Sequence, residues 1–582
     1  MSVIEMQPVT VAPEDRPMKL IEALKIVNAR PQQAAQREDV FIVCGFTPLH
    51  LQTFLEAHLL VRSPDRRVRV NSGLYGDVAG NLERAAAAAP DAVAVVMEWP
   101  DFDPRLGVRT AGSAALSRDE LRESVYSQMH RFQKIIDERL AETTLALSLP
   151  SLPARHSCIQ QSWLADPVNA TLRRCFADFS LWASERKNIR LLNADRLDQL
   201  SPPHARWDAG AELATGFPYH LNHASILADL LSRLIRLPLP KKGLITDLDD
   251  TLWNGIVGEA GVDGISWTLD RHTHHHALYQ QQLSVLAHAG VLVAVASKND
   301  PSVIREAFAR PDLLLDVNHI FPLEVSWGPK SVAVGRILQT WNVGPDSIVF
   351  VDDSPMELAE VQAAFPGIQC LLFPKNDPQA CLGLLDRLRD LFGKRVISEE
   401  DALRTNSLRA QPALSTDFLE TAEAEITFSA VKNSSDSRPL ELINKTNQFN
   451  LNGRRFTDSE WLHYLRDPET HLLSATYRDK YGALGKIAVL GARRSHDKLL
   501  IDLWVMSCRA FSRRIEHQCL LRLFNAHGVD EISFDFKRTP RNNPIQEFFA
   551  GLVGENPEGP LTLTLAQFEQ RCPRLSHTVK DG

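Results

Sequence analysis

Short runs of apolar, largely β-branched residues alternate with helix-like segments along the first two thirds of the chain. The run at 40–44 is followed by a helical pattern at 51–60 and by a second strand-like run at 67–70. This strand, helix, strand order is typical of parallel sheets. Later runs at 243–246, 291–296 and 347–351 repeat it. The rhythm therefore predicts an α/β fold.

The length of 582 residues exceeds one ordinary hydrophobic core, so several domains are expected. Prolines and the pair Lys241 and Lys242 indicate a boundary near residue 240. We expect a polar N-terminal tail at 1–37, an α/β domain at 38–240, a doubly wound α/β domain at 241–397, a linker helix at 398–420 and an α+β domain at 421–582.

Composition narrows the class of protein. The formal net charge of −8 argues against a broad nucleic-acid-binding face. No apolar stretch approaches the ~18 residues of a membrane span, and the start of the chain lacks the pattern of a secretory signal, so we expect a cytoplasmic protein. Eight scattered cysteines suggest neither a disulfide framework nor a structural zinc site.

Three carboxylates follow the strand-like run at 243–246, namely Asp247, Asp249 and Asp250. The carboxyl ends of parallel strands are where such folds place their chemistry. Asp247 and Asp249 would share one face of a continuing strand, where a divalent cation offsets their repulsion. The other polar residues at predicted strand ends, with the lysine between them, are Ser297, Lys298, Asn299, Lys330, Asp352 and Asp353.

The order and spacing of these residues resemble the motifs of the haloacid dehalogenase (HAD) superfamily of phosphotransferases, over roughly residues 243–392. The resemblance implies a Rossmann-like domain that uses Mg²⁺. The implied metal ligands are Asp247, Asp249, Asp352 and Asp353, and which of the last two touches the metal stays open.

The same resemblance implies a role for each residue. Asp247 would be the nucleophile that takes the phosphoryl group, and Asp249 the acid that protonates the leaving oxygen and then activates water. Ser297 and Lys330 would bind the transferred phosphoryl oxygens. The remaining residues expected to bind substrate here are Thr251, Lys298 and Asn299.

The spacing also predicts an open site. Asp249 and Ser297 are 48 positions apart, and this interval must already hold a flap, a helix and the next strand. No cap domain fits, so we expect a capless phosphatase. An open site suits a phosphate that is carried on something bulky, such as an enzyme-tethered group.

Further blocks are similar to the FkbH-like branch of this superfamily, whose members load glyceryl units in polyketide biosynthesis. The blocks lie at 251–259, 297–300, 327–331, 350–355, 444–450 and 506–509. The resemblance implies that 1,3-bisphosphoglycerate is captured as a thioester and that its 3-phosphate is removed. The glyceryl group then passes to the phosphopantetheine arm of an acyl carrier protein.

The last third of the chain resembles the acetyltransferase (GNAT) fold, with 499–506 as the strand before a pantetheine-binding turn. Cys508 is the candidate acyl-accepting thiol, because it ends a strand beside cations and precedes a helix; packing alone is the alternative. The turn has arginines where a CoA-binding loop usually has glycine, so CoA use stays open. Arg509 and Arg513 are candidates to hold a phosphate of the pantetheine arm or of the substrate.

Two polar clusters have competing interpretations. The amides of the block 444–450 either bind glyceryl hydroxyls or cap a helix; they are Asn444, Asn447, Gln448 and Asn450. Four histidines after the flap look like metal ligands, but we expect them to form a solvated helix start; they are His272, His274, His275 and His276.

The domain at 38–240 is similar to the SGNH-hydrolase-like domain of longer family members, with 73–76 and 98–101 at strand ends. Residues 44–47, Cys-Gly-Phe-Thr, stand where that family has its serine nucleophile. His220 and His223 have no identified partner. We therefore expect a non-catalytic domain that binds the carrier protein or supports a homo-oligomer.

These patterns favour a bifunctional glyceryltransferase and phosphatase. One alternative is a Mg²⁺-dependent phosphatase joined to a separate CoA-dependent acyltransferase. Another is a phosphatase whose outer domains serve only as scaffold.

Overall fold

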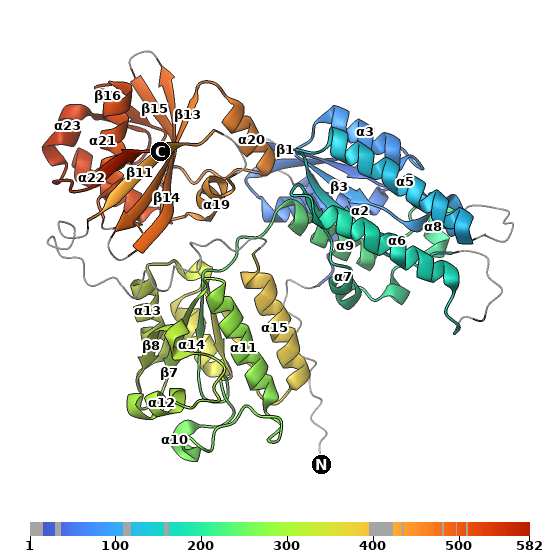
Figure 1. Cartoon of the computed structure of the whole chain (residues 1–582), viewed down its shortest axis with the longest axis horizontal. Helices are drawn as coiled ribbons and strands as arrows, with labels where there is room; N and C mark the ends of the chain where they lie inside the picture. Colours follow the sequence, from blue (N-terminus) through green and yellow to red (C-terminus); the bar gives the residue numbers. More distant parts are fainter. Residues whose placement is uncertain are drawn as a thin grey trace. The chain divides into compact units, whose positions relative to one another are not determined.

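The computed structural model describes residues 16–29, 36–108, 118–155, 161, 163–394, 423–432, 436–479, 482–495, 498–507, 510–511 and 513–582. Its strands form three sheets (Figure 1). Contacts divide the chain into two units: Met1–Pro238 with Thr457–His463, and Leu239–Phe456 with Tyr464–Gly582. The first unit ends at Pro238, and the second contains both later predicted domains, so the predicted domain bounds stay a prediction. The predicted linker helix at 398–420 lies outside the described residues.

The sheet of the first unit is parallel throughout. In spatial order its strands are β2 (Arg66–Ser72), β1 (Gln36–Val43), β3 (Ala92–Val96), β4 (Thr144–Ser148) and β5 (Ile189–Leu191). Every residue of β3 and β4 is buried, because helices cover both faces of the sheet. The α/β expectation for this region is confirmed.

The helices of this unit pack in two layers (Figure 1). The layer on Val40 and Ile42 contains α1 (Leu20–Asn28), α2 (Leu49–Arg62) and α9 (Leu221–Ile235). The layer on Phe41 and Val43 contains α3 (Val78–Ala88), α5 (Arg118–Arg139) and α6 (Pro167–Ser184). Three short helices complete the unit: α4 (Trp99–Phe102), α7 (Ala194–Leu200) and α8 (Ala209–Thr215).

The predicted N-terminal tail at 1–37 needs correction, because it contains α1. Ala23 of this helix is completely buried, and the Met18 backbone N–H donates to Ser225 Oγ at 2.8 Å. The apolar face of Leu20–Asn28 packs on α2, which explains why a segment between polar stretches folds.

The second unit begins with another parallel sheet. Its strands in spatial order are β10 (Gln369–Leu372), β9 (Ile348–Asp352), β6 (Gly243–Thr246), β7 (Leu292–Ser297) and β8 (Ile320–Val325). One face packs on α11 (His274–His288), α12 (Pro301–Phe308) and α15 (Pro378–Phe392), and the other on α13 (Lys330–Trp341) and α14 (Pro355–Ala364). This is the predicted doubly wound arrangement.

No extra domain interrupts this sheet. Between β6 and β7 the chain forms only the short helix α10 (Val257–Ala260), its flanking loops and α11. All residues from 163 to 394 are described, so the capless arrangement expected from the spacing is what the structure has.

The third sheet is mainly antiparallel, as expected for an α+β region. Its path is β17 (Leu561–Thr564), β16 (Glu531–Phe534), β15 (Lys498–Met506), β14 (Gly482–Ser495), β13 (Thr470–Asp479), β11 (Glu425–Ala430) and β18 (Thr578–Asp581). The helices of this region are α19 (Arg438–Lys445), α20 (Asp458–Arg466), α21 (Ile515–His527), α22 (Asn543–Val553) and α23 (Leu565–Arg571).

The strand predicted at 499–506 is β15. Its residues Leu499–Ile501 pair in parallel with β16. Its last two residues pair with the short strand β12 (Phe449–Asn450). In the described part of the chain, no helix combines the length and the apolar character that a membrane crossing requires.

Candidate functional site

Lys330 lies among three carboxylates at the carboxyl edge of the β6–β9 sheet. Its Nζ is 2.7 Å from Asp247 Oδ1, 2.6 Å from Asp352 Oδ2 and 2.7 Å from Glu357 Oε2. Lys330 and Asp352 are almost completely buried. Charged groups are buried in proteins only with partners, and three carboxylates around one ammonium leave an excess of negative charge.

The local fold explains why these side chains meet. β6 and β9 are neighbours, and the Asp247 backbone N–H donates to Val351 O at 3.0 Å. α13 starts at Lys330, and α14 starts two residues before Glu357. Strand ends and first helical turns therefore supply all four groups.

The acidic cluster fits Mg²⁺. Asp247, Asp352 and Glu357 each offer a carboxylate oxygen, and these atoms lie within 4.8 Å of one another. Carboxylate oxygens are the ligands that Mg²⁺ prefers. The predicted ligand set does not include Glu357. Its position five residues after Asp352, in the first turn of a helix, is the signal that could have identified it.

Asp353 has a different partner from its neighbour Asp352. Its Oδ2 is 2.8 Å from Lys375 Nζ, which is also 2.7 Å from Asp250 Oδ2. Lys375 thus joins the loop after β6 to the end of β9. Sequence reasoning missed Lys375, because no motif surrounds it.

Asp249 also lies outside the acidic cluster. Its Oδ1 accepts from Trp253 Nε1 at 2.9 Å and from the Val257 N–H at 3.1 Å, and its Oδ2 accepts from Asn299 Nδ2 at 2.9 Å. Asn299 Nδ2 lies 3.2 Å from Ser297 Oγ as well. The structure therefore brings Asp249, Ser297 and Asn299 together, while the assignment of Asp249 and Asp353 as side-chain metal ligands stays a prediction.

The two other residues expected to bind substrate border this arrangement. Lys298 Nζ is 2.8 Å from Glu357 Oε1 and is partly exposed. The Thr251 hydroxyl is buried and has no hydrogen-bond partner among the described residues.

The histidines after the flap correct a prediction. His272 is exposed and His274 is half-buried, but His275 and His276 are buried. His276 Nδ1 lies 2.9 Å from Thr251 O, and His275 Nε2 lies 2.9 Å from Lys375 O. Both rings lie close to Phe373, so tertiary packing overrides the polar pattern of the helix start.

Burial dominates the electrostatics of the cluster. It raises the pKa of Asp247 to about 7 and that of Asp352 to about 6, although the Lys330 ammonium acts in the opposite direction on both. For Lys330, burial disfavours the ammonium, but the carboxylates of Asp247 and Asp352 outweigh it and raise its pKa. A bound divalent cation would favour the ionised form of both carboxylates.

The amides of the block 444–450 serve the fold at most positions. Asn444 Nδ2 donates to Phe456 O at 2.8 Å, and its Oδ1 accepts from the Phe456 N–H. Asn447 Oδ1 accepts from Arg455, and Asn450 is buried and bonds Thr446 O. A role of these residues in binding acyl groups stays a prediction.

Gln448 is half-buried, and its amide has no hydrogen-bond partner among the described residues. Arg513 is buried, with its guanidinium 3.6 Å from Asp479 and over the Tyr477 ring. Cys508 and Arg509 lie outside the described residues.

Comparison with known proteins shows a similar fold in a solved structure, without a match in sequence. No family model matches this chain, and no curated protein matches it in sequence. The N-terminal part of a Bacteroides fragilis protein, which contains a phosphatase domain and was crystallised with Mg, is 17% identical, with a TM-score of 0.52; the match covers 65% of this chain and 99% of that one. This share exceeds what the segment 243–394 alone could supply, so the shared fold extends beyond the β6–β9 sheet.

Two of the weaker matches cover a quarter of the chain or less. A HAD family enzyme from Bacteroides thetaiotaomicron is 15% identical over 25% of this chain and 98% of that one, with a TM-score of 0.18. A nourseothricin acetyltransferase is 12% identical over 18% of this chain and 68% of that one, with a TM-score of 0.13.

Proposed function

We propose that this chain is a Mg²⁺-dependent phosphatase of the HAD type that works through an aspartyl phosphate on Asp247. The arrangement that carries the proposal is the buried Lys330 ammonium among the carboxylates of Asp247, Asp352 and Glu357, at the open edge of a parallel sheet. The fold shared with a phosphatase-containing protein supports it.

The first chemical step uses Asp247 and Asp249. A carboxylate oxygen of Asp247 forms a bond to phosphorus, and the bond from phosphorus to the ester oxygen breaks. The leaving oxygen takes a proton from Asp249, which Trp253, Val257 and Asn299 hold in a fixed orientation.

The second step returns the enzyme to its starting state. Asp249 takes a proton from a water molecule, whose oxygen attacks phosphorus and breaks its bond to the Asp247 oxygen, so inorganic phosphate leaves. Lys330 stabilises the negative charge of the phosphoryl oxygens throughout. Mg²⁺ held by Asp247, Asp352 and Glu357 would neutralise further phosphoryl charge.

We infer further that the substrate is a phosphoglyceryl thioester made from 1,3-bisphosphoglycerate, and that the glyceryl product is passed to an acyl carrier protein. The FkbH-like blocks of the sequence support this inference, and so does the capless site, which leaves room for a tethered substrate. A thiol, with Cys508 as the candidate, would displace the acyl phosphate and form the thioester.

A first experiment tests the phosphatase alone. Phosphate release from p-nitrophenyl phosphate is measured with and without Mg²⁺, together with the intact mass of acid-quenched enzyme. We expect Mg²⁺-dependent release and a phosphoryl adduct, both abolished in Asp247→Asn. Asp300→Asn, which changes the exposed N-cap of α12, is the matched control and keeps both. Full activity of Asp247→Asn would overturn the proposed mechanism.

A second experiment tests the substrate. The full chain is incubated with Mg²⁺, 1,3-bisphosphoglycerate and a pantetheinylated carrier protein, and the intact masses of both proteins are read. A glyceryl increment on the carrier, changed to a phosphoglyceryl increment or lost in Asp247→Asn, is expected. Phosphate release with no increment on either protein would leave the phosphatase and refute glyceryl transfer. Acyl transfer that requires added CoA would favour the alternative acyltransferase.

A further inference from the structure

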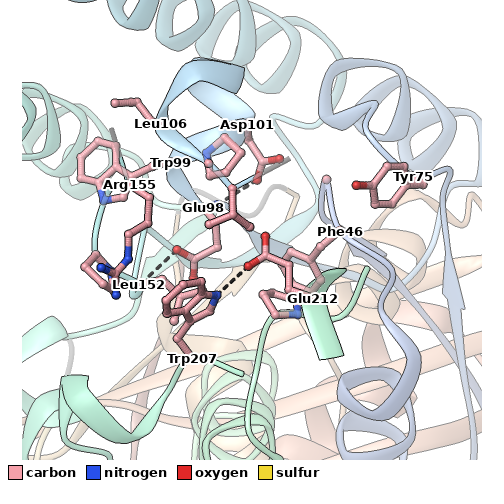
Figure 2. Close-up of a pocket in the computed structure, with 16 residues that line it drawn as sticks. Phe46, Tyr75, Glu98, Trp99, Asp101, Leu106, Leu152, Arg155, Trp207 and Glu212 are labelled. Atoms are coloured by element: carbon pink, nitrogen blue, oxygen red, sulfur yellow. Dashed lines mark hydrogen bonds between the residues drawn. The ribbon is translucent and has the colours of Figure 1, made fainter. Parts of the chain in front are cut away.

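A cavity of about 70 Å³ opens at the carboxyl edge of the first unit's sheet (Figure 2). Gly45 and Phe46 follow β1, Glu98 and Asp101 follow β3, and Trp207 closes another side. No residue of the phosphatase site lines it. The carboxyl edge of an open parallel sheet is where ligands of α/β domains bind.

Asp101 is the carboxylate of this cavity that keeps one oxygen without a hydrogen-bond donor among the described residues. Its Oδ2 accepts from the Glu98 backbone N–H at 2.8 Å, and no donor among the described residues reaches its Oδ1. Oδ1 lies against Gly45, where a Cβ atom would be only 1.7 Å away. A glycine at position 45 is therefore what lets the carboxylate occupy this place.

The neighbouring carboxylate of Glu98 is already engaged. It accepts hydrogen bonds from the Ser151 and Leu152 backbone N–H groups at 3.0–3.2 Å, and from the Ser151 and Tyr219 hydroxyls at 2.7 Å. Four donors fix it in place beside Asp101. Burial, with the charge of Glu98 adding to it, raises the pKa of Asp101 to about 7, although the hydrogen bond from the Glu98 N–H works against the rise.

The rest of the lining is aromatic and aliphatic, and its aromatic rings favour positive charge. Phe46, Tyr75, Trp99 and Trp207 line the cavity, and the ring face of an aromatic side chain attracts cations. The Arg155 guanidinium already lies 4.3 Å from the Trp207 ring centroid, while Trp207 Nε1 donates to Glu212 at 2.6 Å. The lining thus carries three carboxylates and one exposed cation.

From this arrangement we propose that the first unit binds a small organic ammonium ion, with the cationic group on Asp101 Oδ1 and its alkyl part against the aromatic walls. A neutral polyol fits less well, because it needs several uncommitted donors and acceptors, whereas Glu98 and the indole of Trp207 are already bonded. The site is independent of the phosphatase proposal.

The test uses a pair of probes of equal size, ethanolamine and ethylene glycol, titrated into the full-length protein and followed by ligand-detected NMR. We expect saturable binding of ethanolamine that is at least about tenfold tighter than that of ethylene glycol. Asp101→Asn keeps an acceptor for the Glu98 N–H but removes the charge, and should weaken ethanolamine binding at least tenfold.

Asp77→Asn is the matched control, because Asp77 caps α3 and does not line the cavity. It should leave ethanolamine binding unchanged. Equal affinity for the two probes in the unmodified protein, or ethanolamine binding that survives Asp101→Asn in a folded protein, would overturn the proposal. Absence of saturable binding by either probe would overturn it as well.

Discussion

Lys375 Nζ lies 2.8 Å from Asp353 Oδ2, whereas Lys330 Nζ lies 2.6 Å from Oδ2 of the preceding residue, Asp352. Two adjacent aspartates at the end of β9 therefore have separate partners. Asp352 belongs to the acidic cluster with Asp247 and Glu357, and Asp353 belongs to the ion-pair network of Lys375.

This separation predicts unequal effects of two conservative changes. Asp352→Asn should lower kcat/KM more than about 100-fold and raise the Mg²⁺ concentration needed for half-maximal activity, because it removes a charge from the proposed metal site. Asp353→Asn should cost about tenfold, as expected for a supporting group. Steady-state kinetics at a series of Mg²⁺ concentrations measure both effects. Equal losses of kcat/KM in the two variants would contradict the separate roles of Asp352 and Asp353.

A second prediction concerns Lys375. Lys375→Met removes the ammonium that joins Asp250 to Asp353, so the two loops lose their common anchor and kcat should fall about tenfold. The change also removes positive charge near the acidic cluster, so Mg²⁺ affinity should not weaken. Lys394→Met, a lysine that bonds Ala289 O, is the matched control. An unchanged kcat with weaker Mg²⁺ binding would refute this role.

The sequence predicted those residues of the phosphatase site that stand at the ends of apolar strands. Asp247 directly follows an apolar strand, Ser297 and Asp352 are the last residues of theirs, and parallel strands bring their ends to one edge. The contacts of Lys375 with Asp250 and Asp353 could not be predicted, because they join side chains 125 and 22 positions apart, from loops without a motif.

The burial of two histidines shows the same limit of prediction from a single sequence. His275 and His276 belong to a polar run, and the sequence indicated a solvated helix start. Phe373, almost 100 positions later in the chain, covers both rings. Packing between distant segments decided their environment, and a single sequence does not record such packing.

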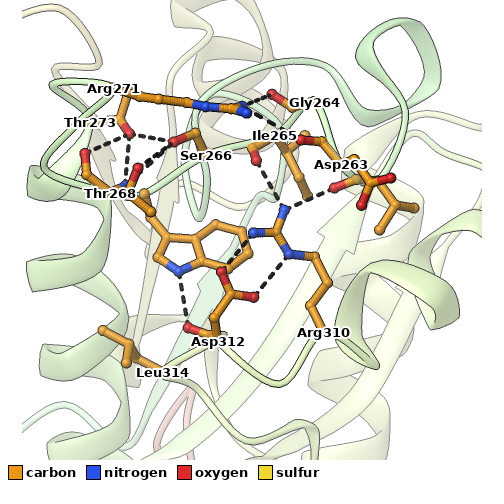
Figure 3. A network of polar contacts seen from close by, with 12 residues as sticks. Asp263, Gly264, Ile265, Ser266, Thr268, Arg271, Thr273, Arg310, Asp312 and Leu314 are labelled. Carbon is orange, nitrogen blue, oxygen red and sulfur yellow. Dashed lines mark hydrogen bonds and ion pairs between the residues drawn. The ribbon is translucent and has the colours of Figure 1, made fainter.

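The loop before α11 gives a third prediction (Figure 3). The guanidinium of Arg310 donates to Val262 O at 2.9 Å and to Ile265 O at 3.0 Å, and lies 4.1 Å from the Trp267 ring centroid. Arg310 therefore holds the loop segment 262–267 in place. Arg310→Ala should lower the free energy of unfolding by about 2–3 kcal/mol, since it leaves two partly buried carbonyls without their charged donor and removes the contact with the Trp267 ring.

The matched control is Arg271→Ala. Arg271 is exposed and donates to Gly264 O in the same loop (Figure 3). Its loss should cost less than about 0.5 kcal/mol. Denaturant unfolding of the two variants provides the comparison, and similar losses would show that the loop does not depend on Arg310.

The last prediction is a pH dependence that arises in the first unit. His223 is buried between the hydroxyls of Ser201, 2.9 Å from Nδ1, and Ser151, 3.3 Å from Nε2. Burial, and then the charge of Arg206, lowers the pKa of His223 to about 3. The folded protein thus keeps this imidazole neutral at pH values where an unfolded chain, with a pKa near 6.5, takes up a proton.

The direction of this pH dependence follows from the number of protons that each state binds. Below about pH 6.5 the unfolded state binds the extra proton, so the free energy of unfolding falls as the pH falls, by about 2 kcal/mol at pH 5 from this group. His223→Gln removes the titration, so its stability deficit relative to the unmodified protein should shrink between pH 7 and pH 5. Urea unfolding at several pH values measures this, and the deficit should stay constant between pH 7 and pH 8. A deficit that grows toward pH 5 would mean that His223 is protonated in the folded protein.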